Sequence, residues 1–370
     1  MLREIYIRPL GLHASSRTEG AEAVWGSLTL AGGWLDFTAI EILERNGSAI
    51  ERRIAGLGEF FERDWGRRTL NAADMFEALR GTRPRLAGLA LDRPRLMGIV
   101  NVTPDSFSDG GRLATARAAI AHALRLEQEG ADILDIGGES TRPGATPVPV
   151  DEEMRRVLPV IEGLAGRTRA LISIDTRKAE VMRAATSVGA DIVNDVSALM
   201  HETKSLEAAA ATGCPVILMH AQGDPRTMQE NPRYDDVLLD VFDFLEARVG
   251  ACIAAGIPKA KLVVDPGIGF GKSLAHNLEL MAGLSLLHGL GVPVLLGASR
   301  KEFIGQLTGE RVAADRVEGS IGAAIAAAAQ GAQILRVHDV KATRRALDVW
   351  LAATAGDRAA PVDRSGTPQS

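Results

Sequence analysis

Aspartate and asparagine side chains stand at the ends of short apolar runs in this chain of 370 residues. Asp175, Asn194 and Asp265 each lie at the end of such a run. Their oxygens accept hydrogen bonds, and three acceptors from separate strands suit a flat heterocycle that carries several N–H donors. One buried aspartate is usually a helix cap or half of a structural ion pair. Acceptors at the ends of three separate strands instead favour a ligand site.

Positive side chains follow the last two runs. Lys301 lies in the segment Ser299-Arg300-Lys301, and Arg336 and His338 end the final run. Residues two apart on a strand point to the same side, so Arg336 and His338 could grip one diphosphate together. The alternative for His338 is a structural histidine whose hydrogen bonds are satisfied within the fold.

The first run ends at Asn101 and continues into a polar loop that contains Asp105 and Asp109. Mg²⁺ prefers oxygen ligands and needs few from the protein when a substrate phosphate supplies others. The Asn101 amide oxygen is therefore a candidate magnesium ligand. Asp105 and Asp109 are equally consistent with turn formation, because aspartate and glycine favour turns.

Glycines follow two other runs. Gly137 and Gly138 would let the backbone approach a ligand closely, and Arg142 after them carries a guanidinium suited to a carboxylate or a phosphate. Residues 265–273 are glycine-rich but do not form a nucleotide-binding P-loop, because Pro266 stands where that motif requires glycine. We interpret them as a strand loop that approaches its ligand through the backbone.

Eight apolar runs supply the elements that must position these side chains. Uninterrupted runs of this length are typical of strands buried on both faces of a parallel sheet, and helical patterns separate them. The runs are residues 98–101, 133–137, 171–175, 192–195, 216–220, 262–265, 294–297 and 334–338. They predict a (β/α)8 TIM barrel over residues 95–355, with its active site at the carboxyl ends of the strands. The positive residues then follow strands seven and eight, where such barrels often bind phosphate.

The N-terminal residues 1–94 differ from the rest and predict a small additional α/β region. Its predicted strands are residues 4–7 and 27–30, and its predicted helices are residues 39–45 and 71–79. It has no catalytic constellation, so we expect it to pack on or beside the barrel without taking part in catalysis. Its arginine-rich stretch, residues 67–85, predicts a solvated face, and residues 81–95 predict a linker.

The sequence also predicts the local structure of three further segments. Apolar residues at helical spacing predict a helix over residues 154–164, with Asp151 as its cap. Residues 222–234 lack periodicity and predict a long loop over the barrel mouth, which we expect to act as a mobile lid. Residues 356–370 are rich in Pro and Ser and predict a disordered tail.

Composition excludes several classes of protein. The net charge of −5 argues against non-specific nucleic-acid binding, which needs a basic face. The two cysteines, Cys214 and Cys252, form neither a metal-binding spacing nor a disulfide framework and predict small packed residues. No signal-peptide core and no apolar stretch of membrane length occurs. The sequence therefore predicts a cytoplasmic protein with no membrane partner.

Taken together, seven segments of this sequence resemble the dihydropteroate synthase family of pterin-binding barrels. They are residues 101–111, 137–144, 174–175, 194–195, 265–272, 299–301 and 336–339. The match covers residues 96–350, and the ordered agreement of all seven segments is highly specific. The resemblance implies a transferase of folate biosynthesis. Its substrates would be 7,8-dihydropterin-6-ylmethyl diphosphate and 4-aminobenzoate, and its products 7,8-dihydropteroate and diphosphate. It also implies Mg²⁺ as cofactor, a homodimer, and competition by sulfonamides for the 4-aminobenzoate site.

The resemblance assigns a role to each matching position. The implied pterin-binding residues are Asp175, Asn194, Asp265, Lys301, Gly297 and Met219. The implied 4-aminobenzoate-binding residues are Phe107, Thr141, Arg142, Pro143 and Phe270. Asn101, Arg336 and His338 match the diphosphate positions, with Asn101 as the metal ligand. The implied catalytic residues are Asp175, Lys301, Arg336 and His338.

One position departs from the family pattern. Glu302 follows Lys301 where a small polar residue is usual, and its carboxylate would repel that of 4-aminobenzoate. We therefore expect backbone N–H groups at the start of the following helix to hold the substrate carboxylate.

Two other functions stay open. A corrinoid-linked methyltetrahydrofolate methyltransferase uses a similar barrel, but would not need the cluster of Lys301, Arg336 and His338. A non-catalytic paralogue would bind pterin alone, and its expected mark is the loss of Asn101, Arg336 or His338. All three residues are present.

Overall fold

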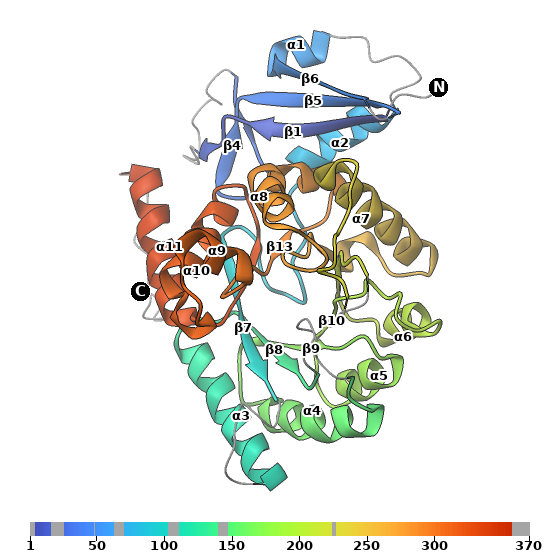
Figure 1. The fold of residues 1–370 in the computed structure, drawn as a ribbon, viewed down its shortest axis with the longest axis vertical. Helices are drawn as coiled ribbons and strands as arrows, with labels where there is room; N and C mark the ends of the chain where they lie inside the picture. Colours follow the sequence, from blue (N-terminus) through green and yellow to red (C-terminus); the bar gives the residue numbers. More distant parts are fainter. Residues whose placement is uncertain are drawn as a thin grey trace, which may run out of the picture.

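The computed structural model describes residues 4–15, 26–47, 49–62, 70–102, 111–139, 147–223 and 227–356. It consists of a barrel with surrounding helices and an N-terminal sheet packed beside them (Figure 1). No helix among these residues is long and apolar enough to cross a membrane.

Eight parallel strands form the barrel. They are β7 (Arg95–Asn101), β8 (Ile133–Gly137), β9 (Leu171–Asp175), β10 (Ile192–Asp195), β11 (Val216–Met219), β12 (Leu262–Asp265), β13 (Leu295–Leu296) and β14 (Ile334–Val337). Their order in the sheet is β12-β11-β10-β9-β8-β7-β14-β13, and a bridge between Val264 and Val294 brings the two ends of the sheet together. The predicted (β/α)8 barrel is confirmed, and every predicted run forms one of its strands.

Helices follow the strands and cover the outside of the barrel. The α-helices are α3 (Gly111–Gln128), α4 (Val150–Leu164), α5 (Ala179–Ser187), α6 (Ser205–Thr212), α7 (Val237–Ala254), α8 (Leu274–Gly283), α9 (Glu302–Thr308), α10 (Val317–Ala328) and α11 (Val340–Ala355). Short 3₁₀ helices are η2 (Lys259–Lys261), η3 (Leu284–Leu290) and η4 (Ala313–Asp315). The predicted helix over residues 154–164 is confirmed as α4. The predicted cap is wrong: Pro149 occupies the N-cap position and Asp151 lies in the first turn, where its charge still suits the helix dipole.

An apolar layer fills the amino-terminal end of the barrel. Seven strands each contribute one buried residue to it: Met97, Ile133, Ile192, Ile217, Val263, Leu295 and Ile334. Leu86 and Leu91 complete the same cluster and are 1% and 4% exposed. The segment predicted as a linker is therefore a plug that keeps water from this end of the barrel. The site must then lie at the opposite end.

The N-terminal region contains two small antiparallel sheets. One has the order β1-β5-β6, with β1 (Glu4–Leu10), β5 (Ala39–Asn46) and β6 (Ala49–Gly56). The other joins β2 (His13–Ala14), β4 (Leu35–Phe37) and β3 (Leu28–Thr29). Two helices follow the strands, α1 (Leu57–Glu62) and α2 (Leu70–Arg80).

The predicted helix over residues 39–45 is wrong, because these residues form the central strand β5. A window of seven residues with Ile40, Ile42 and Leu43 fits both helical and strand periodicity. Pairing decides between them: β5 lies between β1 and β6 over its whole length. The strand β6 follows β5 directly, with Asn46 paired to Ala49, whereas β1 comes from an earlier part of the chain that a seven-residue window does not include.

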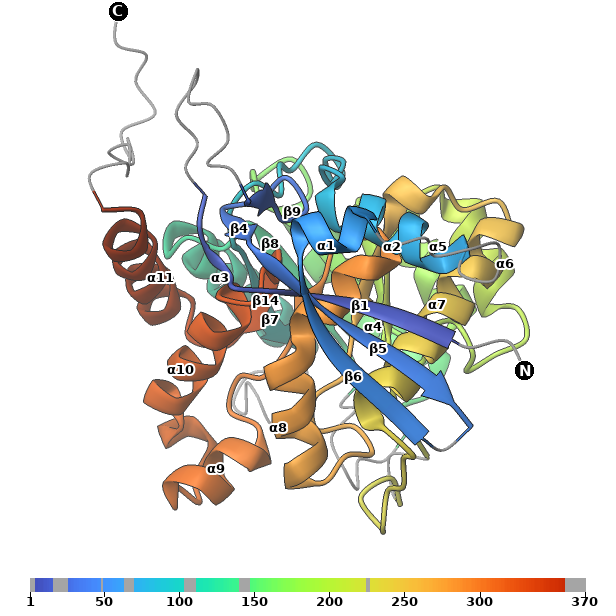
Figure 2. The same ribbon diagram turned by 90° about the horizontal axis from the view of Figure 1, so that it is seen from above.

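The N-terminal sheet lies across α7 and α8 on the side of the barrel (Figure 2). Its apolar residues belong to the same core as those of the barrel. Polar contacts reinforce the packing: the Tyr6 hydroxyl donates to Asp243 at 2.8 Å, and the Trp34 indole N–H donates to the Ala328 carbonyl at 3.1 Å. The described part of the N-terminal region is therefore an integral layer of the molecule.

Arg83 contradicts the prediction that the arginine-rich stretch is solvated. It is 7% exposed, and its guanidinium donates to the carbonyls of Ala78, Gly81 and His288 at 2.8–2.9 Å. The charge is buried because three oriented carbonyl oxygens replace the water that it loses.

Candidate active site at the carboxyl ends of the barrel strands

The register between neighbouring strands places four of the strand-end residues side by side in one row. Asn101 pairs with Gly137, Gly137 pairs with Asp175, and Asp175 pairs with Asn194 across neighbouring strands. Gly137 leaves the space between Asn101 and Asp175 open: a methyl group there would lie 3.8 Å from Asn101 Oδ1 and 3.6 Å from Asp175 Cβ. Met219 and Asp265 pair in the same way two strands further on.

Arg336 reaches across the barrel mouth from β14. Its Nε donates to Asp135 at 2.6 Å and its Nη2 donates to Asp175 at 2.7 Å. Asn194 donates its amide to the same Asp135 carboxylate at 3.2 Å. Three of the predicted site residues thus join one hydrogen-bonded network, and Asp135 stands at its centre.

Sequence analysis missed Asp135, although a signal for it was present. Asp135 lies inside the apolar run 133–137, two residues before Gly137, so both face the barrel interior. It is fully buried in the structure. A carboxylate in a strand that is otherwise apolar needs a buried partner, and Arg336 and Asn194 provide it.

One guanidinium therefore serves two carboxylates. Burial raises the pKa of Asp175; the Arg336 charge opposes this effect and the Asp135 charge adds to it. Burial alone would lower the pKa of Arg336, but Asp135 and Asp175 raise it above its usual value. The group carries an excess of negative charge whenever both carboxylates are ionised. Such an excess stabilises positive charge on a ligand that lies against it.

The opposite wall comes from β12 and the residues after β13. Asp265 accepts a hydrogen bond from the Gly267 N–H at 2.7 Å. The Lys301 amine donates to the Ile268 carbonyl and lies 4.5 Å from the centre of the Phe270 ring. Burial lowers the pKa of Lys301 to about 8, although the Asp265 charge opposes the shift.

A strained turn places Lys301 at this wall. Arg300 has a φ of +59°, which is unfavourable for a residue with a side chain. Its guanidinium makes two hydrogen bonds to Asp339, at 2.6 and 3.0 Å, and its N–H donates to the Ser320 hydroxyl at 2.8 Å. These contacts offset the strain, so that the residues on either side face the barrel mouth.

His338 lies directly after β14 beside this turn. Its Nδ1 is 3.1 Å from the Ser299 hydroxyl, which also accepts the His338 backbone N–H at 3.2 Å. Gly297 keeps the neighbouring space open: a methyl group there would lie 3.7 Å from Arg336 Cβ and 3.8 Å from Asp265 Oδ2.

Some predicted residues are not placed. Phe107, Thr141, Arg142 and Pro143 lie outside the described residues, as do Asp105 and Asp109. Glu302 is described, and its side chain is 71% exposed and paired with Arg316 at 2.8 Å. Its charge is therefore exposed to solvent and partly neutralised.

The loop over residues 222–234 lies against the loop that follows β12. Gln229 donates to the Gly269 carbonyl at 2.5 Å, and the Tyr234 hydroxyl donates to the Gly271 carbonyl at 2.8 Å. The loop therefore covers this side of the mouth, apart from residues 224–226, which are not described. Its predicted action as a mobile lid stays a prediction.

The residues present are compatible with a magnesium ion carried by a phosphate-bearing substrate. The described part of the chain has no group of three or more His, Cys, Asp or Glu side chains that could hold a metal by themselves. Asn101 offers one neutral oxygen at the barrel mouth. A single protein ligand suits Mg²⁺ when phosphate oxygens and water complete its coordination.

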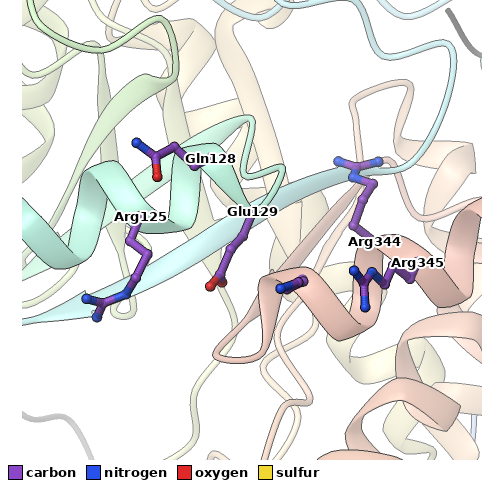
Figure 3. Close-up of a pocket in the computed structure, with 6 residues that line it drawn as sticks. Arg125, Gln128, Glu129, Arg344 and Arg345 are labelled. Atoms are coloured by element: carbon purple, nitrogen blue, oxygen red, sulfur yellow. The ribbon is translucent and has the colours of Figure 1, made fainter. Parts of the chain in front are cut away.

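A separate cavity of about 380 Å³ lies on the outer wall of the barrel, between α3 and α11 (Figure 3). Its lining consists of the long polar side chains Arg125, Gln128, Glu129, Lys341, Arg344 and Arg345. It includes none of the strand-end residues, and we do not consider it part of the active site.

Comparison with known proteins identifies the class. The sequence matches the family of pterin binding enzymes over residues 97–338. The chain belongs to this family, as the seven segments predicted. It is 52% identical over 261 residues to the dihydropteroate synthase of Escherichia coli strain K12, which covers 70% of this chain and 92% of that protein. The dihydropteroate synthase of Neisseria meningitidis serogroup B is 54% identical over 269 residues, which cover 71% of this chain and 93% of that protein.

Solved structures give the same result. Dihydropteroate synthase from Xanthomonas albilineans with 4-aminobenzoic acid is 57% identical, with a TM-score of 0.70, over 74% of this chain and 99% of that one. The same enzyme in complex with 7,8-dihydropteroate has 54% identity and a TM-score of 0.67 over the same shares. The Yersinia pestis enzyme with a sulfonamide drug has 51% identity and a TM-score of 0.68 over 72% and 96%.

Proposed function

We propose that this protein acts as a dihydropteroate synthase, joining 7,8-dihydropterin-6-ylmethyl diphosphate to 4-aminobenzoate with release of diphosphate. The observation that carries the proposal is a barrel mouth in which hydrogen-bond acceptors and cations lie next to one another. Arg336 binds Asp135 and Asp175 beside Asn194 on one wall. Lys301 and Asp265 lie together on the other wall. Relatives with more than half of their residues identical support the same reaction.

The pterin ring binds against the strand ends in this proposal. The carboxylates of Asp175 and Asp265 accept its N–H groups, and the Asn194 amide adds both a donor and an acceptor. Met219 at the end of β11 is 4% exposed and supplies apolar floor beside Asp265. Gly137 and Gly297 leave room for a flat ring because they place no side chain there.

Breaking the bond between the pterin methylene carbon and the diphosphate oxygen separates charge. Positive charge develops on the pterin methylene, and the excess negative charge around Asp135 and Asp175 stabilises it. Negative charge develops on the departing diphosphate, which His338 and Arg336 contact. A magnesium ion held by Asn101 and the diphosphate would neutralise part of that charge.

The 4-aminobenzoate amine then attacks the methylene carbon, and the new C–N bond replaces the broken C–O bond. The nitrogen then releases one proton to the departing diphosphate or to water. An aromatic amine is already neutral near pH 7, so this step needs no strong general base. Phe270 and Lys301 form one wall for the ring, and residues 141–143 and Phe107 are proposed to complete the site. The exposed Glu302 is paired with Arg316, which weakens the repulsion expected for a substrate carboxylate nearby.

A turnover assay with both substrates and Mg²⁺ tests the proposal. We expect 7,8-dihydropteroate and diphosphate in equal amounts, and inhibition by a sulfonamide that competes with 4-aminobenzoate. Binding of pterin without turnover would instead favour the non-catalytic paralogue. Methyl transfer from methyltetrahydrofolate to a corrinoid would favour the methyltransferase. The homodimer and the cytoplasmic location stay predictions.

A further inference from the structure

A second buried lysine lies behind the candidate site. Lys272, in the loop after β12, is 3% exposed. Its amine donates to His220 Nδ1 at 2.8 Å, to the Phe270 carbonyl at 3.0 Å and to the His220 carbonyl at 3.4 Å. Three acceptors match the three donors of an ammonium group. Burial and the Lys301 charge lower the pKa of Lys272 to about 7, while the Asp265 charge opposes the shift.

When Lys272 carries its proton, the neutral His220 ring accepts in this contact. Burial and the neighbouring Lys272 lower the pKa of His220 to about 3, so its ring is neutral at physiological pH. The ring is held edge-on against Phe244, with 4.8 Å between ring centres, and lies 6.0 Å from the Tyr234 ring. Because both sides of the ring are packed, its Nδ1 has a fixed direction toward Lys272.

The loops after β11 and β12 meet at Lys272 with no room between them. Gly267 has a φ of +69°, and a methyl group on it would lie 1.8 Å from the His220 carbonyl oxygen. Gly271 has a φ of +63°, and a methyl group there would lie 2.3 Å from the Gln222 carbonyl oxygen. The two loops therefore have one fixed contact, and Lys272 makes the hydrogen bonds that cross it.

We propose that Lys272 is a positioning residue for the 4-aminobenzoate side of the site. By binding the Phe270 carbonyl and both acceptors of His220, it holds the β12 loop against the end of β11. Phe270 is thereby held beside Lys301, whose amine lies 4.5 Å from the ring centre and donates to the Ile268 carbonyl of the same loop. The inference rests on the proposed synthase activity and adds a residue to its machinery.

The competing explanation is that Lys272 only stabilises the fold. The chain offers a matched control for it. Arg83 is also a buried cation with three hydrogen-bond acceptors, in its case all backbone carbonyls, but it lies at the N-terminal layer. Lys272→Met and Arg83→Met each remove one buried cation and leave its acceptors unpaired. Both should lower the melting temperature.

Kinetics separate the two explanations. We expect Lys272→Met to raise the KM for 4-aminobenzoate on the order of tenfold to a hundredfold, as when a binding wall moves by about 1 Å. The kcat should change less, and the affinity for a plain pterin should stay within about twofold, because the strand ends are untouched. Arg83→Met should leave both constants at their wild-type values in the folded protein. An unchanged KM for 4-aminobenzoate in folded Lys272→Met would overturn the proposal.

A second pair of variants covers the case in which Lys272→Met does not fold. His220→Asn keeps an acceptor close to the position of Nδ1, whereas His220→Leu removes it. We expect the KM for 4-aminobenzoate to rise in His220→Leu and to recover toward the wild-type value in His220→Asn. Equal values in the two variants would contradict the role of the contact. Absence of turnover in the wild-type protein would instead contradict the proposed function itself.

Discussion

At the scale of single residues, the structure changes what is expected of Arg336. The sequence paired it with His338 as a diphosphate ligand, but two of its nitrogens bind Asp135 and Asp175. Removing Arg336 would leave two buried carboxylates without their cation. Loss of one partner of a buried ion pair lowers the free energy of unfolding by up to about 3–5 kcal/mol. We therefore expect Arg336 to support the pterin pocket in addition to its predicted contact with the leaving group.

We predict that Arg336→Met weakens the binding of plain pterin and of pterin diphosphate alike, because Asp175 loses the partner that orients it. Calorimetry with both ligands measures the effect, and urea unfolding measures the accompanying loss of stability. Wild-type affinity for plain pterin in this variant would show that the pair with Asp175 has no role in binding.

His338 should behave differently, because its ring lies beside the Ser299 hydroxyl at the edge of the mouth, whereas Arg336 binds the pterin-side carboxylates Asp135 and Asp175. His338→Ala is expected to weaken pterin diphosphate while leaving plain pterin at wild-type affinity. The same calorimetric comparison decides the matter. Equal weakening of both ligands would remove His338 from the diphosphate site.

Asp175 should give the pterin pocket a pH dependence. Asp175→Asn should weaken plain pterin roughly tenfold to a hundredfold, since a charge-assisted hydrogen bond is worth about 1.5–3 kcal/mol. Ligand N–H groups need the ionised carboxylate, and the pKa of Asp175 is raised. Affinity should therefore fall as pH decreases, and this fall should begin above the range near pH 3.9 where an ordinary aspartate titrates.

The affinity for plain pterin, measured over a range of pH for the wild-type protein and for Asp175→Asn, tests the direction of this pH dependence. The variant should show a flatter profile, because the asparagine does not titrate. An affinity that rises toward low pH in the wild-type protein would contradict the assignment.

At the scale of elements, the plug at the amino-terminal end of the barrel is the least obvious feature. Leu86 is 1% exposed and packs with one residue from most of the strands. Leu86→Ala should cost about 2–5 kcal/mol of unfolding free energy, the usual range for a buried leucine. Arg93→Ala, on the exposed part of the same segment, should stay within about 0.5 kcal/mol of the wild type.

Urea unfolding of the two variants gives the comparison. Turnover of folded Leu86→Ala should remain near the wild-type value, since the site lies at the other end of the strands. Similar midpoints for Leu86→Ala and Arg93→Ala would mean that the segment is not part of the barrel core.

At the scale of the whole molecule, we predict that the N-terminal layer has a structural role. Among the described residues, it makes no hydrogen bond or ion pair with the strand-end side chains, and it shares its apolar core with the barrel. A chain that begins at Gly81 keeps Arg83 and the plug, whereas one that begins at Leu91 loses Arg83 and Leu86. We expect both shortened chains to be less stable than the full chain, and the second to be the less stable of the two.

Activity per folded molecule should survive in either shortened chain that stays soluble. Thermal unfolding and turnover of the soluble fraction measure the two properties separately. A folded but inactive chain beginning at Gly81 would show that the N-terminal layer completes the site or an active oligomer.

The sequence by itself determined the barrel and the positions of most candidate site residues. Each strand is a local apolar run, and in a parallel barrel all carboxyl ends meet at one mouth. Order along the chain therefore sufficed to bring Asp175, Asn194, Asp265, Lys301 and Arg336 together. Local periodicity was likewise enough for α4, whose apolar face repeats over several turns.

Tertiary structure decided every feature that depends on partners far apart in the chain. Arg336 and Asp175 are separated by 161 residues, and no local pattern shows that Asp175 and Asp135 share the Arg336 guanidinium. The strand β5 depends on its pairing with β1, from an earlier part of the chain, because its own residues fit two periodicities. Arg83, Lys272 and the Leu86 plug are buried only because distant segments close over them. The role of a buried charge or apolar side chain depends on the groups that replace its surrounding water. The fold as a whole determines which groups these are.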